Sequence, residues 1–212
     1  MKSVKLVGIV GMLAGLCCSS QAVLLAPGGV GLDAPQAPGS VVLGSLVTPY
    51  SFGGITGTIT SWVVRDPSNP LGGLSFYYQV SNTGTEGISR VSTSDFGVIP
   101  GSPVEVSTIT APFDGSVTGG VSPFTATRSS GAGSVVGFLF IGAQEVLTGQ
   151  SSVVMVVNTA YQSFTTTAGS VIDSSSVNVA ILGPIPEPSN VMAASLLLLP
   201  FGVSALRIVR KR

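Results

Sequence analysis

Apolar and polar residues alternate with a period of two through much of the middle of the chain. In "GTITSWVVR" (57–65), Ile59, Ser61, Val63 and Arg65 fall on one face of an extended strand, and Thr60, Trp62 and Val64 on the other. This period and the abundance of Val, Ile, Thr, Phe and Tyr are typical of β-strands. Eight strands are predicted: 40–52, 57–65, 74–82, 88–96, 103–109, 134–141, 151–160 and 176–182.

Turn signals separate these segments, as in "NTGTEG" (82–87) and "IPGSP" (99–103). No window of the middle carries a sustained helical stripe. The spacing predicts an all-β domain over 40–183, an antiparallel β-sandwich of the Ig-like or jelly-roll-like kind. The preceding residues 23–39 are rich in Pro and Gly and are predicted to form a flexible lead-in.

The first 22 residues form a different pattern, with two lysines followed by an apolar run from Leu6 to Leu16. Ser20 and Ala22 then occupy the −3 and −1 positions of a cut after Ala22. This layout predicts a secretory signal peptide over 1–22, with an N-terminal membrane anchor as the alternative. Both cysteines fall inside it, so the mature chain is expected to have no disulfide.

A second apolar run, Val191 to Leu206, follows the last predicted strand. It carries no charge, and its extension to Val209 is about as long as a hydrocarbon core is thick. A basic cluster ends the chain: Arg207, Arg210, Lys211 and Arg212. The pattern predicts a transmembrane helix whose basic end stays cytoplasmic, with an amphipathic tail or a buried core helix as alternatives.

Composition changes this picture mainly through charge. Only 8% of the residues are charged, and the formal net charge is zero. Between Val23 and Ile185 there are three basic and eight acidic residues, which leaves this middle at −5 and the ends at +5. A lysine-free acidic middle argues against nucleic acid as a partner, because phosphate binding needs clustered Lys and Arg.

The middle of the chain has few residues of the kinds that form catalytic or metal sites. The chain has no histidine, and the expected mature chain has no cysteine, so most metal and triad chemistry is excluded. The carboxylates are scattered, and Asp66 before Pro67 and Asp114 before Gly115 are interpreted as turn residues. We therefore expect no enzyme activity, no catalytic residue, no metal site and no cofactor, although a two-carboxylate glycosidase and a loop calcium site stay open.

Aromatic residues gather at Trp62, Phe76, Tyr77 and Tyr78. They are interpreted as core residues, with a sugar-binding platform as the alternative. Strand alternation predicts that Phe76 and Tyr78 point one way and Tyr77 the other.

The tripeptide Pro186, Glu187, Pro188 stands between the β domain and the apolar run. Together with that run and the basic end, it resembles the PEP-CTERM sorting signal of bacteria that make exopolysaccharide. The sorting signal is predicted over 184–212, and the resemblance covers about its last 27 residues. The stretch "LTGQSSVVMVVNTAYQSF" before "VIDSSSVNV" is also loosely similar to the β domains of that family. The resemblance implies recognition by exosortase, a membrane transpeptidase-like enzyme thought to cleave near the motif.

These observations predict an exported, non-catalytic surface or matrix protein associated with exopolysaccharide. The C-terminal helix would anchor it in the inner membrane before processing, and exosortase would be its partner. The alternative is a carbohydrate-binding or adhesive module. A third class, a secreted hydrolase, would need two carboxylates facing each other across a cleft.

Overall fold

A computed structural model describes residues 23–39, 41–97 and 102–185 of the 212-residue chain. This part is all-β: it contains two antiparallel sheets and one short 3₁₀ helix, η1 (Gly142–Gln144), with no α-helix among the described residues. The prediction of an all-β antiparallel fold is confirmed. No helix within these ranges is long and apolar enough to cross a membrane.

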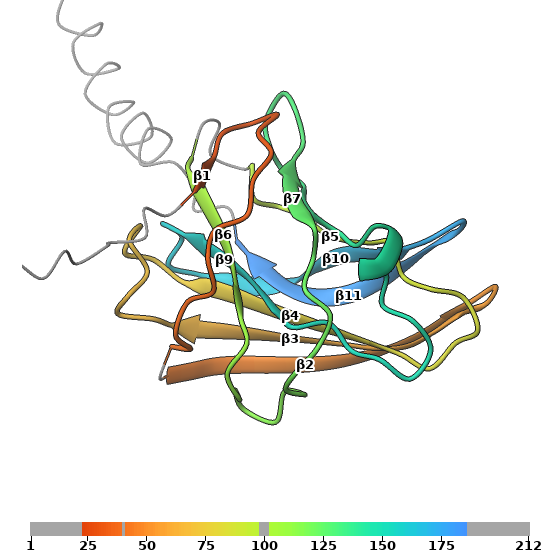
Figure 1. Ribbon diagram of the computed structural model, residues 1–212. Coiled ribbons are helices and arrows are strands. Elements are labelled where there is room, and N and C mark those ends of the chain that lie inside the picture. Colours follow the sequence, from red (N-terminus) through yellow and green to blue (C-terminus); the bar gives the residue numbers. More distant parts are fainter. Residues whose placement is uncertain (1–22, 40, 98–101, 186–212) are drawn as a thin grey trace, which may run out of the picture.

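The larger sheet, sheet A, has six strands in the order β1-β6-β9-β4-β3-β2. Their bounds are β1 (Leu24–Leu25), β6 (Val104–Ile109), β9 (Val154–Thr159), β4 (Ser75–Asn82), β3 (Ile55–Arg65) and β2 (Val41–Phe52). Figure 1 shows β2 along one margin of this sheet, beside β3.

The smaller sheet, sheet B, has five strands in the order β11-β10-β5-β8-β7. Their bounds are β11 (Ser176–Pro184), β10 (Phe164–Ile172), β5 (Arg90–Thr93), β8 (Val136–Leu139) and β7 (Thr125–Arg128). From β4 onward the chain passes between the sheets repeatedly, so neighbours in space are often distant in sequence.

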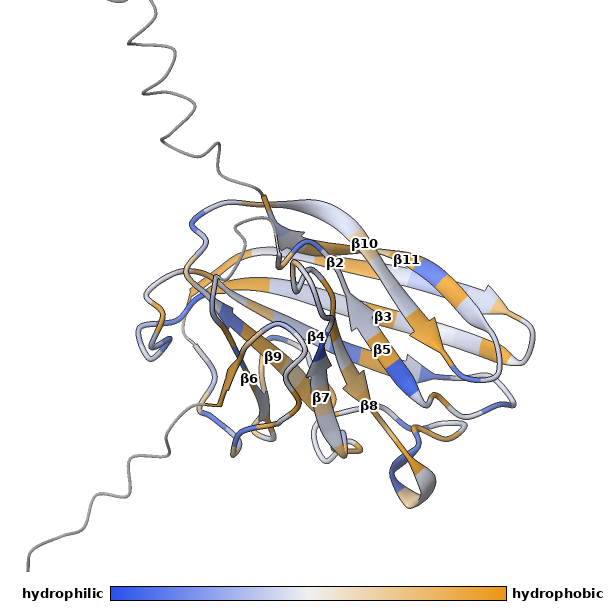
Figure 2. Cartoon of the chain, turned by 90° about the horizontal axis from the view of Figure 1, so that it is seen from above, coloured by the Kyte–Doolittle hydropathy of each residue, from blue (hydrophilic) through white to orange (hydrophobic). Residues whose placement is uncertain are grey.

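The main core lies between the two sheets and is built by the alternation seen in the sequence. Ile59, Val63 and Phe76 from sheet A meet Phe138 and Ile181 from sheet B in one buried cluster. Figure 2 shows the matching bands of hydrophobic and less hydrophobic residues along the strands. Alternating side chains point to opposite faces of a sheet, which is why one set enters this core.

The outer face of sheet A carries a second, smaller apolar cluster. Trp62, Tyr77 and Val156 lie there beneath Phe113, which comes from the segment after β6. The Phe113 ring meets Trp62 edge-on at 5.7 Å and Tyr77 at 5.0 Å between centroids. Edge-to-face contact at these distances is a favourable aromatic geometry.

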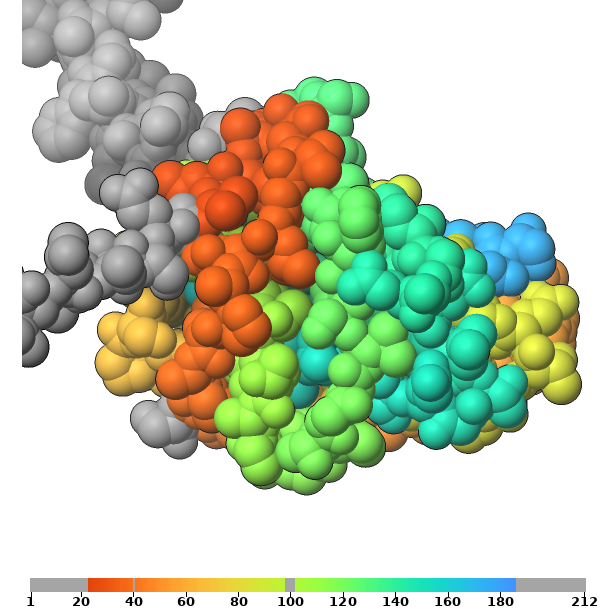
Figure 3. Space-filling model, in the orientation of Figure 1, coloured from red at the N-terminus to blue at the C-terminus, as the bar shows by residue number. Residues whose placement is uncertain are grey.

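The eight predicted strands all occur, with ends shifted by up to three residues. Strands β1, β7 and β10 were not predicted. The 23–39 segment, predicted as a flexible lead-in, contains β1 and lies against the domain, as Figure 3 shows in orange-red beside the yellow-green of β6. Its backbone bonds to both sheets, through Gly31 N–H to the Ala126 carbonyl and Gln36 N–H to the Thr108 carbonyl.

Candidate functional site

The loop 65–73 between β3 and β4 is organised by the Asp66 carboxylate. Asp66 Oδ1 accepts hydrogen bonds from the backbone N–H and the hydroxyl of Ser68, at 2.8 and 2.6 Å. Its Oδ2 accepts from Tyr77 Oη at 2.9 Å and from Gln36 Nε2 at 3.2 Å. A carboxylate bonded to its own loop in this way fixes a turn, which agrees with the interpretation of Asp66 as a turn residue.

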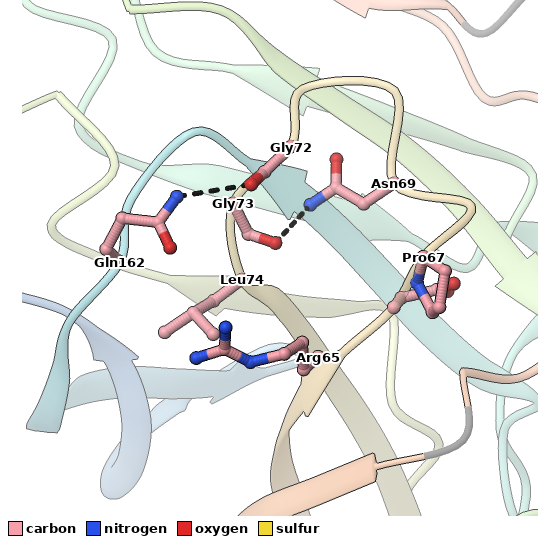
Figure 4. Close-up of a pocket in the computed structure, with 8 residues that line it drawn as sticks. Arg65, Pro67, Asn69, Gly72, Gly73, Leu74 and Gln162 are labelled. Carbon is pink, nitrogen blue, oxygen red and sulfur yellow. Dashed lines mark hydrogen bonds between the residues drawn. The ribbon is translucent and has the colours of Figure 1, made fainter.

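Asn69 holds the second half of the same loop. Its Nδ2 donates to the carbonyls of Gly73 and Thr159, each at 3.0 Å, and its Oδ1 accepts from Leu71 N–H at 2.9 Å. Figure 4 shows Asn69 reaching Gly73, and Gln162 of the β9–β10 connection donating to the Gly72 carbonyl. The loop is therefore fixed at both of its ends.

Gln36 joins the lead-in to the outer face of sheet A. Its Oε1 accepts from Ser107 Oγ and from Asn158 Nδ2, the latter at 3.0 Å, while its Nε2 donates to Asp66. Asn158 Oδ1 in turn accepts from Ser75 Oγ at 2.6 Å. Polar side chains of β6 and β9 thus bind a single amide from outside the sheet, and Ser75 of β4 bonds to one of them, Asn158.

Glu105 has fewer hydrogen-bond donors than Asp66, the other carboxylate of this network. It is 4% exposed, and Asn158 Nδ2 donates to its Oε2 at 3.4 Å. Burial raises the pKa of Glu105, the Asn158 hydrogen bond lowers it, and the negative charges of Asp33 and Asp66 raise it further. Burial penalises the charged form of a carboxyl, so protonation of Glu105 is favoured by its surroundings.

Two open cavities flank the 65–73 loop. The acidic cavity, of about 380 Å³, has Asp33, Gln36, Ser68 and Glu105 among its lining residues. The loop cavity, of about 390 Å³, is lined by Arg65, Asp66, Pro67, Asn69, Gly72, Gly73, Leu74 and Gln162. Both volumes lie near the low end of small-ligand sites.

The side chains in these cavities suit hydrogen bonding more than catalysis. Carboxylates and amides line the acidic cavity, and Figure 4 shows the Arg65 guanidinium near Leu74 in the loop cavity. Among the residues that the structure describes, no group of three or more His, Cys, Asp or Glu side chains is arranged to hold a metal ion.

The aromatic residues of the predicted cluster are all in the interior. Trp62 is 3% exposed, and Phe76, Tyr77 and Tyr78 are fully buried. Phe76 and Tyr78 belong to the main core and Tyr77 to the outer cluster, which confirms the predicted alternation. These four side chains cannot serve as a sugar-binding platform, since stacking needs an exposed ring face.

The predicted sorting residues lie outside the described part of the chain. This applies to Ala22 at the signal cleavage site, to Pro186, Glu187 and Pro188, and to the basic tail Arg207, Arg210, Lys211 and Arg212. Their roles stay predictions.

Sequence reasoning missed Arg128, a 3%-exposed arginine at the end of β7. Its guanidinium donates to four backbone carbonyls, those of Leu25, Phe96, Ser102 and Gly133, at 2.7 to 3.0 Å. It links the lead-in to two connections, β5–β6 and β7–β8. The only signal in the sequence was that Arg128 is one of three basic residues in an otherwise acidic middle.

Similarity adds no assignment to this geometry. No family model, curated protein or solved structure matches the chain.

Proposed function

We propose that this chain is an exported, non-catalytic surface or extracellular-matrix protein that reaches its destination through a C-terminal PEP-CTERM signal. The observation that carries the proposal is the order of three sequence features: Pro186-Glu187-Pro188, the uncharged run 191–206, and the basic end. The predicted signal peptide, 1–22, would send the β domain outward, which agrees with a basic C-terminal end that stays cytoplasmic.

The boundary of the β domain supports this proposal. Strand β11 ends at Pro184, and Ile185 N–H still bonds to the Ser163 carbonyl at 3.1 Å. Pro186 is the next residue, so the motif follows the folded part without a spacer. Proline on both sides of Glu187 favours an extended backbone, which suits the cleft of a protease-like enzyme such as exosortase.

The architecture and the carboxylates fit a binding or structural role. Two antiparallel sheets with frequent crossings favour a β-sandwich of the Ig-like or jelly-roll-like kind. The buried carboxylate Asp66 accepts hydrogen bonds from three side chains, those of Ser68, Tyr77 and Gln36, and from the Ser68 N–H. A carboxylate with its acceptor sites engaged is poorly suited to proton transfer.

The expected course begins with export and temporary anchoring in the inner membrane by the C-terminal run. Exosortase then processes the signal, and the β domain remains at the cell surface or in an exopolysaccharide matrix. The carbohydrate-binding alternative has less support, because burial removes Trp62, Tyr77 and Tyr78 from any stacking platform.

Mass spectrometry of the mature protein tests the proposal, because it measures both termini and any attached group. We expect an N-terminus at Val23 and a C-terminus near the Pro186–Pro188 motif. If all of the mature protein still ends in "RIVRKR", the sorting function is wrong and a plain tail anchor replaces it.

A further inference from the structure

The two sheets have four edge strands: β1 and β2 in sheet A, and β7 and β11 in sheet B. Three of these edges are short or covered. On sheet A, β1 has two residues. On sheet B, the outer side of β7 pairs with the lead-in: Gly31 N–H bonds to the Ala126 carbonyl at 2.9 Å, and Arg128 N–H to the Gly29 carbonyl at 2.9 Å. An edge of two residues offers little to a partner strand, and a paired edge offers nothing.

The outer side of β11 is covered by side chains of sheet A. Thr48 Oγ1 donates to the Ala180 carbonyl at 2.7 Å, and Tyr78 Oη to the Leu182 carbonyl at 2.8 Å. Leu182 N–H donates to Ser61 Oγ at 3.1 Å. These side chains occupy backbone groups that would otherwise be open to another strand.

The fourth edge, β2, is long and has no such cover. It runs for twelve residues, and within the described ranges no hydrogen bond reaches the side of its backbone that faces away from β3. The β2–β3 turn defines which groups face outward. Phe52 and Ile55 flank a two-residue Gly-Gly loop in which Gly53 has φ 58°, so they form a hydrogen-bonded pair.

The outward groups follow from the alternation along β2. Counting back in twos from Phe52, the even-numbered residues to Leu46 bond toward β3, so Ser45, Val47, Pro49 and Ser51 present their backbone outward. Pro49 has no N–H to offer, but its carbonyl and both groups of the other three are available. This is a hydrogen-bonding edge of about 20 Å at the usual rise per residue.

The β2 edge also lacks the charges that usually protect exposed strands. Its sequence "VVLGSLVTPYSF" contains none. Five of its large apolar side chains are exposed, from 38% at Val42 to 60% at Val47: Val41, Val42, Leu43, Val47 and Phe52. Natural proteins blunt a long edge with Lys, with Pro, with a β-bulge or with a covering segment. β2 has Pro49 and a bulge between Val42 and Gly44, but it has no charge, and its exposed apolar side chains indicate a docking site.

The charges next to the two ends of β2 indicate what docks. Arg65 is exposed and lies opposite Val41 at the start of the strand. Glu86 is exposed at the other end, where its N–H bonds to the Gly54 carbonyl and its carboxylate accepts from Ser174. When two copies of β2 lie antiparallel, Arg65 of each copy comes beside the end of the other that carries Glu86.

We propose that this chain pairs with a second copy of itself, β2 against β2 and antiparallel, to form one continuous sheet through both molecules. The pairing is two-fold symmetric, so a single surface serves both partners. Main-chain hydrogen bonds hold the strands together, and because β2 carries no charged residue, no like charges face each other across the pair. The two-fold axis lies near Val47, because this register sets Val41 of one copy opposite Gly53 of the other and so brings Arg65 to the end that carries Glu86.

Disulfide trapping in cells that express the full chain tests this pairing. Cys17→Ser and Cys18→Ser remove the existing thiols, and Ser45→Cys with Val47→Cys adds two at the proposed axis. Directly opposed hydrogen-bonded residues have Cα atoms about 5.5 Å apart, within disulfide range, so mild oxidation should yield a covalent dimer.

The matched control places the cysteines one strand further in. Thr58→Cys with Thr60→Cys lies on β3, where these residues pair with Pro49 and Val47. Across the proposed dimer they would be separated by about three strand spacings, roughly 14 Å, so they should not crosslink.

A second test measures self-association by sedimentation. Val47→Lys should weaken it about five-fold or more, because like charges then face each other. Thr60→Lys, on β3, should leave it unchanged.

A disulfide-linked species of twice the chain mass, formed by the β2 pair and not by the β3 pair, supports the proposal. Three results overturn it: no crosslink from the β2 cysteines, equal crosslinking from both pairs, or a β2 adduct with the mass of a different protein. Thermal unfolding of each variant shows that the fold is intact. None of these readouts depends on C-terminal processing, so the sorting proposal can fail independently.

Discussion

At the scale of single residues, two buried charged groups are supported in opposite ways. Arg128 donates to four carbonyls, so its charge is held by fixed backbone dipoles. Glu105 has one long hydrogen bond, from Asn158, and two other carboxylates raise its pKa further. A buried charge with few partners destabilises the folded state. Burial lowers the pKa of the Arg128 guanidinium, and its four carbonyl partners offset this desolvation, whereas ionised Glu105 has one long hydrogen bond to offset its own.

Replacement of Glu105 by glutamine should stabilise the protein at neutral pH. A raised pKa means that folded Glu105 holds its proton more tightly than in the unfolded chain. Its favourable contribution is therefore complete below the ordinary glutamate pKa of about 4.3 and is lost as pH rises through the raised value. Glu105→Gln keeps an acceptor for Asn158, so its free energy of unfolding should exceed that of the parent at pH 7 and approach it at pH 4.

Urea unfolding followed by fluorescence of the single tryptophan, Trp62, measures this difference. The control is Glu86→Gln, at an exposed glutamate, which should leave the difference from the parent the same at both pH values. A Glu105→Gln variant that is less stable than the parent at pH 7 would show that the ionised carboxylate is needed.

At the scale of elements, the sequence predicted strands well where alternation and burial agree. Strand β3 was predicted over 57–65 and runs over 55–65, because its two residue sets enter two separate apolar clusters. Strand β10 was missed because it carries a "TTT" run, exposed at Thr165 and Thr166, and buries Gly169, so its apolar pattern is weak. Its pairing with β11 and β5 defines it, and such tertiary partners are not visible in a local window.

The candidate site was less predictable than the sheets. The turn role of Asp66 followed from Asp-Pro, but its bonds to Gln36 and Tyr77 join residues far apart in the sequence. The lead-in was predicted to be flexible from its Pro and Gly content. Its attachment depends on polar side chains of β6 and β9, such as Ser107 and Asn158, which by themselves look like ordinary strand residues.

The hydroxyl groups of sheet A that bond to the β11 backbone give a prediction at this scale. Ser61→Ala removes the acceptor of Leu182 N–H and leaves that buried group unsatisfied. We expect a loss of about 1–3 kcal/mol in the free energy of unfolding and faster amide exchange at Leu182. Ser51→Ala, at an exposed hydroxyl in the β2–β3 hairpin, is the matched control and should change stability by less than about 0.5 kcal/mol. Equal effects of the two changes would mean that Ser61 does not secure β11.

At the scale of the whole molecule, folding and delivery are assigned to separate stretches of the chain. The two sheets and their core are complete between Val23 and Ile185. The features that indicate anchoring and sorting begin at Pro186. A division at this point would let a processing enzyme remove the C-terminal signal without breaking a strand, because β11 ends at Pro184.

Deletion of 186–212 separates these two roles. The shortened chain keeps every described strand, so its urea midpoint and Trp62 fluorescence should match those of the processed protein. It lacks the apolar run and the basic end, so it should leave the membrane fraction and collect outside the cell without surface retention. Cell fractionation measures the distribution. Retention of the shortened chain at the membrane would mean that the β domain itself binds there, and unfolding would mean that the last 27 residues complete the fold.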